Sequence, residues 1–454
     1  GDVHLGDWGL QMGLLIVAVE EEQPDLPYFA EGTEGPFPAE PPVDMDDLSR
    51  LYPMASGRSK TDQDYLERAQ AAVAQMQAGR AGYRALLKHF IDVSVAALKV
   101  DYAFLDVSFD LWKGESDVDP LIAPMVEDLK GRELARLDDG AWIIDVARGD
   151  ENVPILGEDG QPTFDEDGKP KLKKPMPPFM LMNSRGGTGY HATDLATILD
   201  RKNEIAPDRV LYVVDQRQAT HFEQVFRASD KAGYISRDRL EHLGFGTVNG
   251  KDGTPFKTRE GDALRLADLN AMALDEATQK IGATGLSGDI DADEREEIGR
   301  LVARAALRFA DLQNQRTTNY VFDLERFTSF EGKTGPYLLY AAVRMKALLR
   351  RAAAEGHQPG AIAIESDVER KLALTLDGFA LALRLAKEKR MPHYVCEHVY
   401  GLAQAFSAFY AASPILKDGV SADARASRLG IVEAVLKQLE DGLGILGITA
   451  PERM

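Results

Sequence analysis

The residue pattern of this 454-residue chain changes at about residue 263, and no other feature constrains the fold as strongly. Before that point, segments have the pattern of a strand, a polar loop and a helix. After it, apolar residues recur at helical spacing to the end of the chain. We therefore predict an α/β domain over residues 1–262, with an insertion at roughly 20–150, and an all-α domain over residues 263–454.

Three segments carry the strand–loop–helix pattern, beginning near Val3, Phe179 and Arg209. Their strands are apolar without alternation, which is typical of a parallel sheet buried on both faces. Repeated units of this kind predict an α/β core with right-handed crossovers. Within the insertion we expect helices over residues 62–105 and a strand over residues 142–146.

The second half of the chain is predicted to hold four long helices. They cover residues 337–355, 366–392, 394–413 and 422–441. Ser366 and Glu369 match a capping box at the start of the second helix, and Pro392 is expected to end it. This pattern favours a helical bundle that follows the α/β domain.

Composition narrows the functional classes. The net charge of −20 argues against nucleic-acid binding over the whole surface, but basic residues gather at 344–351 and 384–390, which leaves a local nucleic-acid face open. The single cysteine, Cys396, excludes internal disulfides and Cys-x-x-Cys sites, and it fits a cytoplasmic protein. The apolar run over residues 10–19 is too short to span a membrane, so we expect no membrane association.

Polar residues follow the predicted strands, at the edge where open α/β sheets bind ligands. They form three groups: Asp7, Trp8 and Gln11; Tyr190 and Asp194; Gln218 and His221. Tyr190 and Asp194 are four residues apart and share one helix face. A carboxylate beside a tyrosine suits a cationic ligand, especially a guanidinium, which a carboxylate binds in bidentate fashion. The alternative is a helix cap and a packed ring.

Two glycine-rich segments suggest phosphate chemistry. Residues 187–192 match the dinucleotide fingerprint Gly-x-Gly-x-x-Ala, with Asp215 at the end of the next strand, so a dinucleotide-dependent oxidoreductase is one alternative function. The loop over residues 246–259 carries three cations: Lys251, Lys257 and Arg259. Such a loop can close over phosphates; otherwise it is a solvated hairpin tip.

One helix of the second half has an aromatic and basic edge. Tyr337, Tyr340 and Arg344 lie within about 60° of one another at 3.6 residues per turn. The neighbouring face is apolar and comprises Leu338, Ala342, Met345 and Leu349. Exposed aromatic rings with an arginine suit base stacking and phosphate contact. The alternative is that the tyrosines cover the rim of the core.

Taken together, several strings in a fixed order resemble one family, the bacterial arginyl-tRNA synthetases, which are class I ligases. The strings are residues 4–13, 109–116, 190–195, 212–222, 256–261, 335–340 and 451–454. The resemblance implies a Rossmann-like class I catalytic core followed by an α-helical anticodon-binding bundle. It also implies ATP-dependent activation of L-arginine to an adenylate and transfer of arginine to tRNA(Arg).

The resemblance further implies roles for particular residues. Arginine is expected to be bound by Tyr190, Asp194 and Gln218, with Asp194 pairing the guanidinium. ATP with Mg²⁺ is expected to place its adenosine near His242, Gly246 and Thr247, and its phosphates near Lys251, Lys257 and Arg259. The anticodon region of tRNA is expected to contact Tyr337, Tyr340, Arg344, Tyr410 and Met454. We expect a monomer with no protein-bound metal.

The chain departs from the family pattern in two places. It lacks the His-x-Gly-His signature of class I synthetases, which we expect to lie in an N-terminal segment missing from this chain. In the loop that resembles Lys-Met-Ser-Lys-Ser, Glu260 stands where the second lysine is expected, and Lys251 occupies the position of a substitute. A second interpretation is therefore a catalytically silent tRNA-binding fragment of the same family.

Overall fold

The structure, a computed structural model, describes residues 1–149, 151, 153–155, 161–164, 169–170, 175–184, 187–250, 253–254, 265–283 and 291–454. They form two compact units. Unit 1 comprises Gly1–Val43, Met54–Ile91 and Phe109–Phe245, and unit 2 comprises Asp44–Pro53, Asp92–Ser108 and Gly246–Met454. The predicted domain boundary at residues 262 and 263 lies outside the described residues.

Two short pairs of parallel strands occur in unit 1. β1 (Asp2–Leu5) pairs in parallel with β2 (Leu111–Gly114), and β6 (Val210–Tyr212) pairs in parallel with β7 (Leu240–His242). The predicted parallel α/β pattern is confirmed for these strands. β2 lies within the stretch that was predicted as an insertion, so that stretch contributes a strand to the sheet.

The strand predicted near Phe179 pairs with its neighbour in a different direction from the one expected. β5 (Phe179–Met182) pairs antiparallel with β4 (Ala141–Ile144), which also pairs antiparallel with β3 (Arg136–Asp138). The prediction of a parallel strand at this position is therefore wrong. Burial on both faces is also wrong for the strand near Arg209, because Leu211 and Val213 on one face are exposed.

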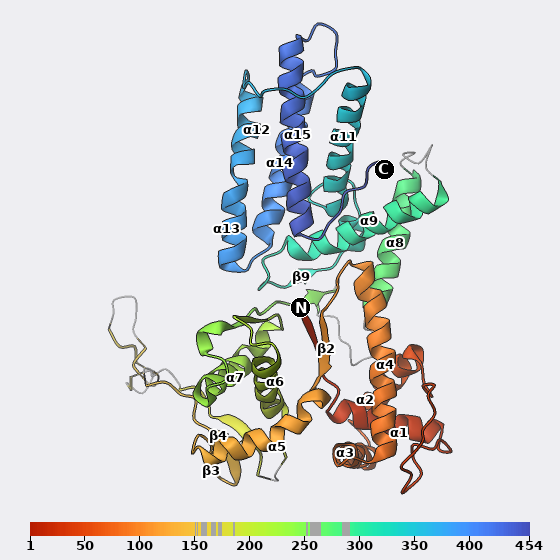
Figure 1. Ribbon diagram of the computed structural model, residues 1–454, viewed down its shortest axis with the longest axis vertical. Coiled ribbons are helices and arrows are strands. Elements are labelled where there is room, and N and C mark those ends of the chain that lie inside the picture. The colour runs from red at the N-terminus through yellow and green to blue at the C-terminus, as the bar shows by residue number, and fades with distance from the viewer. Residues whose placement is uncertain are drawn as a thin grey trace. The chain divides into compact units, whose positions relative to one another are not determined.

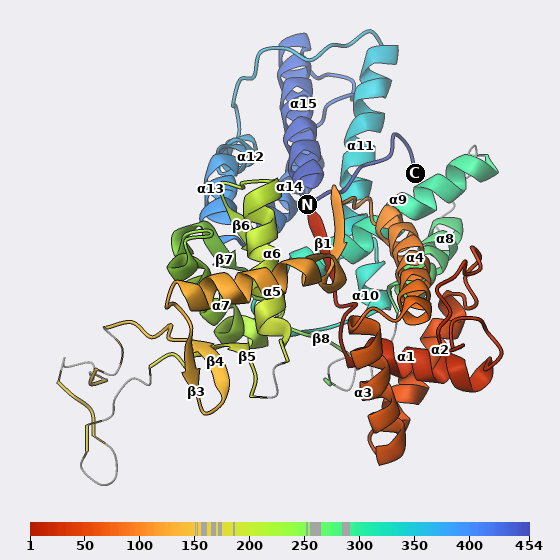
Figure 2. The same ribbon diagram turned by 60° about the horizontal axis from the view of Figure 1, so that its bottom comes forward.

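Helices pack against one another beside these strands (Figures 1 and 2). In unit 1 they are α1 (Leu10–Glu22), α3 (Gln63–Gln77), α5 (Glu115–Gly131), α6 (Tyr190–Glu204) and α7 (Ala219–Ala232), with the short turns η1 (Gln216–Gln218) and η2 (Arg237–Arg239). α6 packs against both α5 and α7. α7 ends at Gly233, whose φ of 70° is left-handed and suits a residue without a Cβ. α2 (Met45–Arg58) and α4 (Ala81–Phe104) contribute residues to both units.

In its described residues, unit 2 is a helical bundle with a small parallel pair, β8 (Val248–Asn249) and β9 (Tyr320–Val321). Its helices are α8 (Leu266–Ala283), α9 (Ala292–Leu312), α10 (Leu324–Phe327), α11 (Gly335–Ala354), α12 (Asp367–Asp377), α13 (Phe379–Lys389), α14 (His393–Ala412) and α15 (Ala422–Ile445). α15 packs against α11 and α14, and these three helices run side by side in Figure 1. The core of unit 2 includes Phe309 of α9 and Phe406 and Phe409 of α14, all fully buried.

The helix predicted over residues 366–392 is in fact two helices. Its start is confirmed, because Ser366 and Glu369 form the capping box of α12. The chain then turns at Gly378, whose N–H donates to Thr375 O at 3.2 Å, and α13 follows. The apolar stripe continues across this break. Glycine has a low helix propensity, so interrupting the helix at Gly378 costs little free energy. Among the described residues, no helix is both long and apolar enough to cross a membrane.

Candidate active site

The register of β1 and β2 brings two acidic residues to one edge of the sheet. Leu5 pairs with Gly114, so the residues that follow both strands lie at the same end. The carboxylate of Asp7 accepts hydrogen bonds from the N–H of Ser116 at 2.9 Å and from its hydroxyl at 2.5 Å. A Cβ on Gly114 would lie 2.6 Å from that carboxylate, so this close approach requires glycine. Asp7 is therefore held rigidly beside the start of α5.

Glu115, the first residue of α5, lies close to Asp7 and Asp194 and was not singled out by the sequence interpretation. Burial raises the pKa of its carboxyl to about 6, and the negative charges of Asp194 and Asp7 add to the rise, while a hydrogen bond from the Trp8 backbone opposes it. Burial also lowers the pKa of the neighbouring His4, which favours its neutral form. The carboxylates of Asp7 and Asp194 thus both lie close enough to Glu115 to raise its pKa. The feature of the sequence that could have identified Glu115 is its position directly after the strand β2.

Asp194 projects from α6 toward α7. His221 Nε2 lies 2.6 Å from Asp194 Oδ2. The ring of His221 also contacts Tyr190 and His191, each at 4.8 Å between centroids. The predicted pairing of Tyr190 and Asp194 on one helix face is consistent with this arrangement, since both residues meet the same imidazole. Burial and the nearby His221 lower the pKa of His191.

Gln218 is placed differently from the other two residues predicted to bind arginine. It is exposed at the end of η1, one turn before His221. Within the described part of the chain, its side chain makes no hydrogen bond to Tyr190 or Asp194. The structure therefore brings together Tyr190 and Asp194 with Glu115 nearby, and leaves the Gln218 side chain in solvent.

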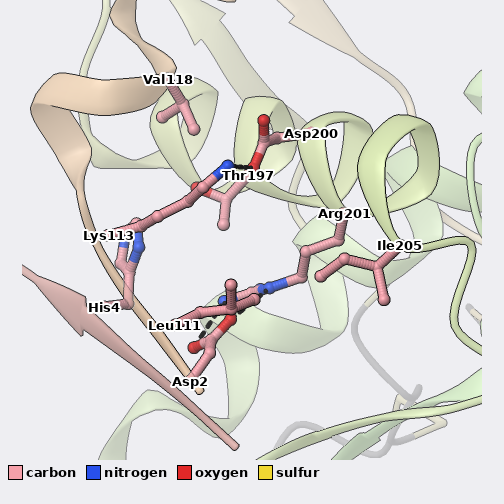
Figure 3. Close-up of a pocket in the computed structure, with 9 residues that line it drawn as sticks. All are labelled: Asp2, His4, Leu111, Lys113, Val118, Thr197, Asp200, Arg201 and Ile205. Atoms are coloured by element: carbon pink, nitrogen blue, oxygen red, sulfur yellow. Dashed lines mark hydrogen bonds and ion pairs between the residues drawn. The ribbon is translucent and has the colours of Figure 1, made fainter. Parts of the chain in front are cut away.

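A small pocket lies beside β1 and α6 (Figure 3). In it the guanidinium of Arg201 pairs with Asp2 at 2.9 Å and donates to the hydroxyl of Tyr212 at 2.8 Å. Lys113 pairs with Asp200 at 2.8 Å. Burial raises the pKa of Tyr212 to about 12. The pocket has room for about one water molecule and is lined by paired charges, so it is too small for an amino-acid substrate.

The residues expected to bind ATP fall in different parts of the chain. His242 ends β7, and its ring stacks on Phe222 at 5.6 Å in unit 1. Gly246 and Thr247 belong to unit 2, where Gly246 N donates to Arg316 O at 2.9 Å. A Cβ on Gly246 would lie 2.5 Å from a backbone oxygen, so glycine is required there. The expected phosphate contacts Lys251, Lys257 and Arg259 lie outside the described residues.

The residues expected to contact tRNA lie on α11, on α14 and at the C-terminus. The apolar face predicted beside them is confirmed, because Leu338, Ala342 and Met345 are buried. Tyr340 and Arg344 are exposed, and the Arg344 guanidinium lies 4.3 Å from the ring centre of Tyr410.

Two of these residues are less accessible. Tyr337 is half-buried, and its ring lies against Tyr400 at 5.7 Å. Met454 is only 7% exposed and packs into the helical core. Tyr340 and Arg344 therefore form the accessible part of the predicted tRNA face, and Tyr410, which is half-buried like Tyr337, lies under the Arg344 guanidinium.

The dinucleotide interpretation of residues 187–192 has no support in the fold. The fingerprint requires a parallel strand before the glycine-rich turn. The strand that precedes it is β5, which is antiparallel to its neighbour. Gly189 instead serves as the N-cap residue of α6.

Comparisons with known proteins agree with the two-part architecture. Residues 2–324 match the catalytic domain of class I tRNA synthetases of the arginine type, and residues 338–454 match the DALR anticodon-binding domain. The chain therefore belongs to the class I aminoacyl-tRNA synthetases.

Comparison with curated relatives identifies the family within this class. The chain is 61% identical to an arginine–tRNA ligase of Hyphomonas neptunium and 54% identical to one of Maricaulis maris. The matches cover the whole of this chain and 74% and 73% of those proteins. Within the class I synthetases, the chain belongs to the arginine–tRNA ligases.

Solved structures support the fold. The arginyl-tRNA synthetase of Thermus thermophilus has a TM-score of 0.74 at 24% identity, and that of Plasmodium falciparum has 0.72 at 22%. Each match covers this whole chain, and 75% and 69% of those chains. The predicted class I core with a helical anticodon-binding domain is confirmed. The activity is ATP-dependent ligation of arginine to tRNA, and the comparisons favour neither alternative function.

Proposed function

We propose that Asp194, Glu115 and Tyr190 form the guanidinium site of this ligase. The observation that carries the proposal is that the Asp194 carboxylate lies close enough to the partly buried Glu115 carboxyl for its negative charge to raise the pKa of Glu115. His221 contacts both Asp194 and Tyr190, which places these two residues together. A guanidinium brings five planar N–H donors and one positive charge, which matches two carboxylates and an aromatic ring. Asp7 adds negative charge behind them. Gln218 remains a candidate contact for the substrate from the exposed side.

The reaction has two steps, and the residues of this chain act by positioning. An oxygen of the arginine carboxylate forms a bond to the α-phosphorus of ATP, and the bond to the β-phosphate breaks and releases pyrophosphate. A hydroxyl of the terminal tRNA ribose then forms a bond to the adenylate carbonyl, and AMP leaves. Holding the guanidinium at Asp194 sets where the substrate carboxylate lies. We assign Lys251, Lys257 and Arg259 to the phosphates and His242, Gly246 and Thr247 to the adenosine.

Mg²⁺ enters this proposal as the partner of ATP. Among the described residues no cluster of three or more histidine, cysteine, aspartate or glutamate side chains fits a metal ion. Phosphate oxygens are ligands that Mg²⁺ prefers, so we propose that the ion arrives with the nucleotide. We also propose that the protein is a monomer and is located in the cytoplasm, where a chain with a single cysteine fits the reducing environment.

Glu115 makes arginine binding dependent on pH. Its pKa of about 6 means that the carboxyl is largely protonated below that pH in the free protein. A bound guanidinium favours the charged form, so binding below pH 6 must release a proton. We expect the arginine association constant to be constant above about pH 7 and to fall by up to about tenfold per pH unit below pH 6. Calorimetry across this range measures it.

The matched variant for this test is Glu115→Gln, which keeps the shape and removes the titrating group. We expect it to bind arginine more weakly at pH 7.5 and to lose the slope below pH 6. An unchanged slope in Glu115→Gln would assign the titration to another group and remove Glu115 from the site.

We propose that tRNA contacts the edge formed by the exposed Tyr340 and Arg344 and the half-buried Tyr410. Among the described residues Arg344 has no carboxylate partner, so its charge is available to a phosphate. Replacing Tyr340 and Arg344 together by alanine should weaken tRNA(Arg) binding by about 1–3 kcal/mol and lower the salt slope of log K by about 0.7–0.9. Filter binding at several salt concentrations measures both quantities.

The control for that test is Arg300→Ala, which removes one positive charge from α9. The guanidinium of Arg300 is already paired with Glu296 at 2.7 Å. This variant should leave both the affinity and the salt slope nearly unchanged. An equal loss in the two variants would mean that net charge, and not this edge, determines binding.

A further inference from the structure

The two ring nitrogens of His221 have unlike surroundings. Nε2 lies 2.6 Å from Asp194 Oδ2. Nδ1 is buried, and within the described part of the chain no group accepts or donates a hydrogen bond to it. The side chain as a whole is 12% exposed. One edge of the imidazole therefore contacts Asp194, while the Nδ1 edge has no hydrogen-bond partner among the described residues.

This asymmetry indicates which nitrogen carries the proton. A carboxylate oxygen accepts hydrogen bonds, so Nε2 must be the donor in a contact of 2.6 Å. The hydrogen-bond partners therefore assign a hydrogen to Nε2, which donates it to Asp194 Oδ2.

Packing holds the ring in this orientation. Tyr190 and His191 contact it from α6, and Phe222 lies 5.1 Å away on α7. The donor on α7 and the acceptor on α6 therefore belong to two helices that pack against each other. Rotation of the imidazole away from Asp194 would require several of these rings to move.

We propose that His221 is a positioning residue of the arginine site, which fixes the plane of the Asp194 carboxylate by donating Nε2–H to Oδ2. Oδ1 and the second lone pair of Oδ2 then remain for the substrate. A fixed carboxylate plane suits a planar donor such as guanidinium, whose two parallel N–H groups need both oxygens in line. This inference rests on the proposed function, since it assumes that Asp194 binds the guanidinium.

Three substitutions at position 221 separate positioning from packing. His221→Gln places an amide nitrogen close to the position of Nε2, so it can still donate to Asp194. His221→Asn places its amide nitrogen near the position of Nδ1, too far from Asp194 to donate a hydrogen bond to it. His221→Leu fills space without any donor. All three are compared in the full chain, with arginine and ATP affinities measured separately and the thermal midpoint of each variant recorded.

We expect His221→Asn and His221→Leu to raise the Kd for arginine by about tenfold or more, the size of a lost hydrogen bond to a charged group. His221→Gln should stay within about threefold of the parent chain. The Kd for ATP should not change in any of them. The inference is overturned if Gln and Asn lose arginine affinity equally, or if all three variants bind arginine as the parent does. Should His221→Leu not fold, the comparison of Gln with Asn decides alone.

The variant Asp194→Asn separates a failure of the positioning role of His221 from a failure of the proposed arginine site. If Asp194→Asn binds arginine as the parent chain does, the proposed arginine site is wrong. If Asp194→Asn loses arginine while His221→Asn and His221→Leu keep it, the site stands and only the positioning role of His221 fails.

Discussion

Asp194→Asn should weaken arginine binding by about a hundredfold. Truncating one partner of a buried, hydrogen-bonded charge pair costs about 2–5 kcal/mol, because the other charge is left unpaired. The asparagine side chain keeps the shape of the carboxylate and still offers an oxygen to His221 Nε2, so the packing of α6 on α7 should persist. Calorimetric titration with arginine measures the loss, and the thermal midpoint verifies the fold.

A charge-matched control is available on a different helix of the same unit. Asp64 lies exposed in the first turn of α3, and Asp64→Asn changes the net charge by the same amount. Its arginine affinity should equal that of the parent chain. If both variants lost affinity to the same degree, long-range charge and not the Asp194 contact would account for binding.

Gly335→Ala should destabilise unit 2 by about 3 kcal/mol or more, the upper range for overpacked cores. Gly335 begins α11 against α9, and a Cβ there would lie 2.1 Å from the backbone oxygen of Ala305. A backbone carbonyl cannot move aside as a flexible side chain can, so the two helices would have to separate. Urea unfolding followed by circular dichroism, with the transition of the helical unit fitted separately, measures the change.

Gly401→Ala is the matched substitution in the same bundle. Gly401 lies inside α14, and a Cβ there meets no atom within 4 Å. Removing a glycine from a helix interior stabilises by about 0.5–1 kcal/mol. The two glycine substitutions should thus have opposite signs. A loss of stability in both would show that the contact between α9 and α11 is not what makes Gly335 necessary.

Local patterns in the sequence predict which segments of this chain form helices and strands better than they predict how the strands pair. The helices α11, α14 and α15 and the cap at Ser366 were predictable because spacing and capping are properties of neighbouring residues. The direction of β5 was not, because a short apolar strand has the same pattern in a parallel and an antiparallel sheet. The break at Gly378 was hidden by an apolar stripe that continues through it.

The residues of the candidate site also differ in whether local spacing or tertiary packing brings them together. Tyr190 and Asp194 could be found from one helix face, since their proximity depends only on spacing along the chain. Glu115 could not, because it approaches Asp194 through the pairing of β1 with β2 and the packing of α5 on α6. His221 was noted as a polar residue after a strand, but its contact with Asp194 depends on how α7 lies against α6.

The buried Arg201 shows that this fold already accommodates a guanidinium internally, between a carboxylate and a tyrosine hydroxyl. The guanidinium ion of the common denaturant carries the same planar donors and the same charge. If the carboxylates near Asp194 bind the substrate guanidinium as proposed, this ion at low concentration should bind to them as well as solvate the unfolded chain. Urea is uncharged and only solvates the unfolded chain, so the two denaturants should then give different apparent stabilities for unit 1.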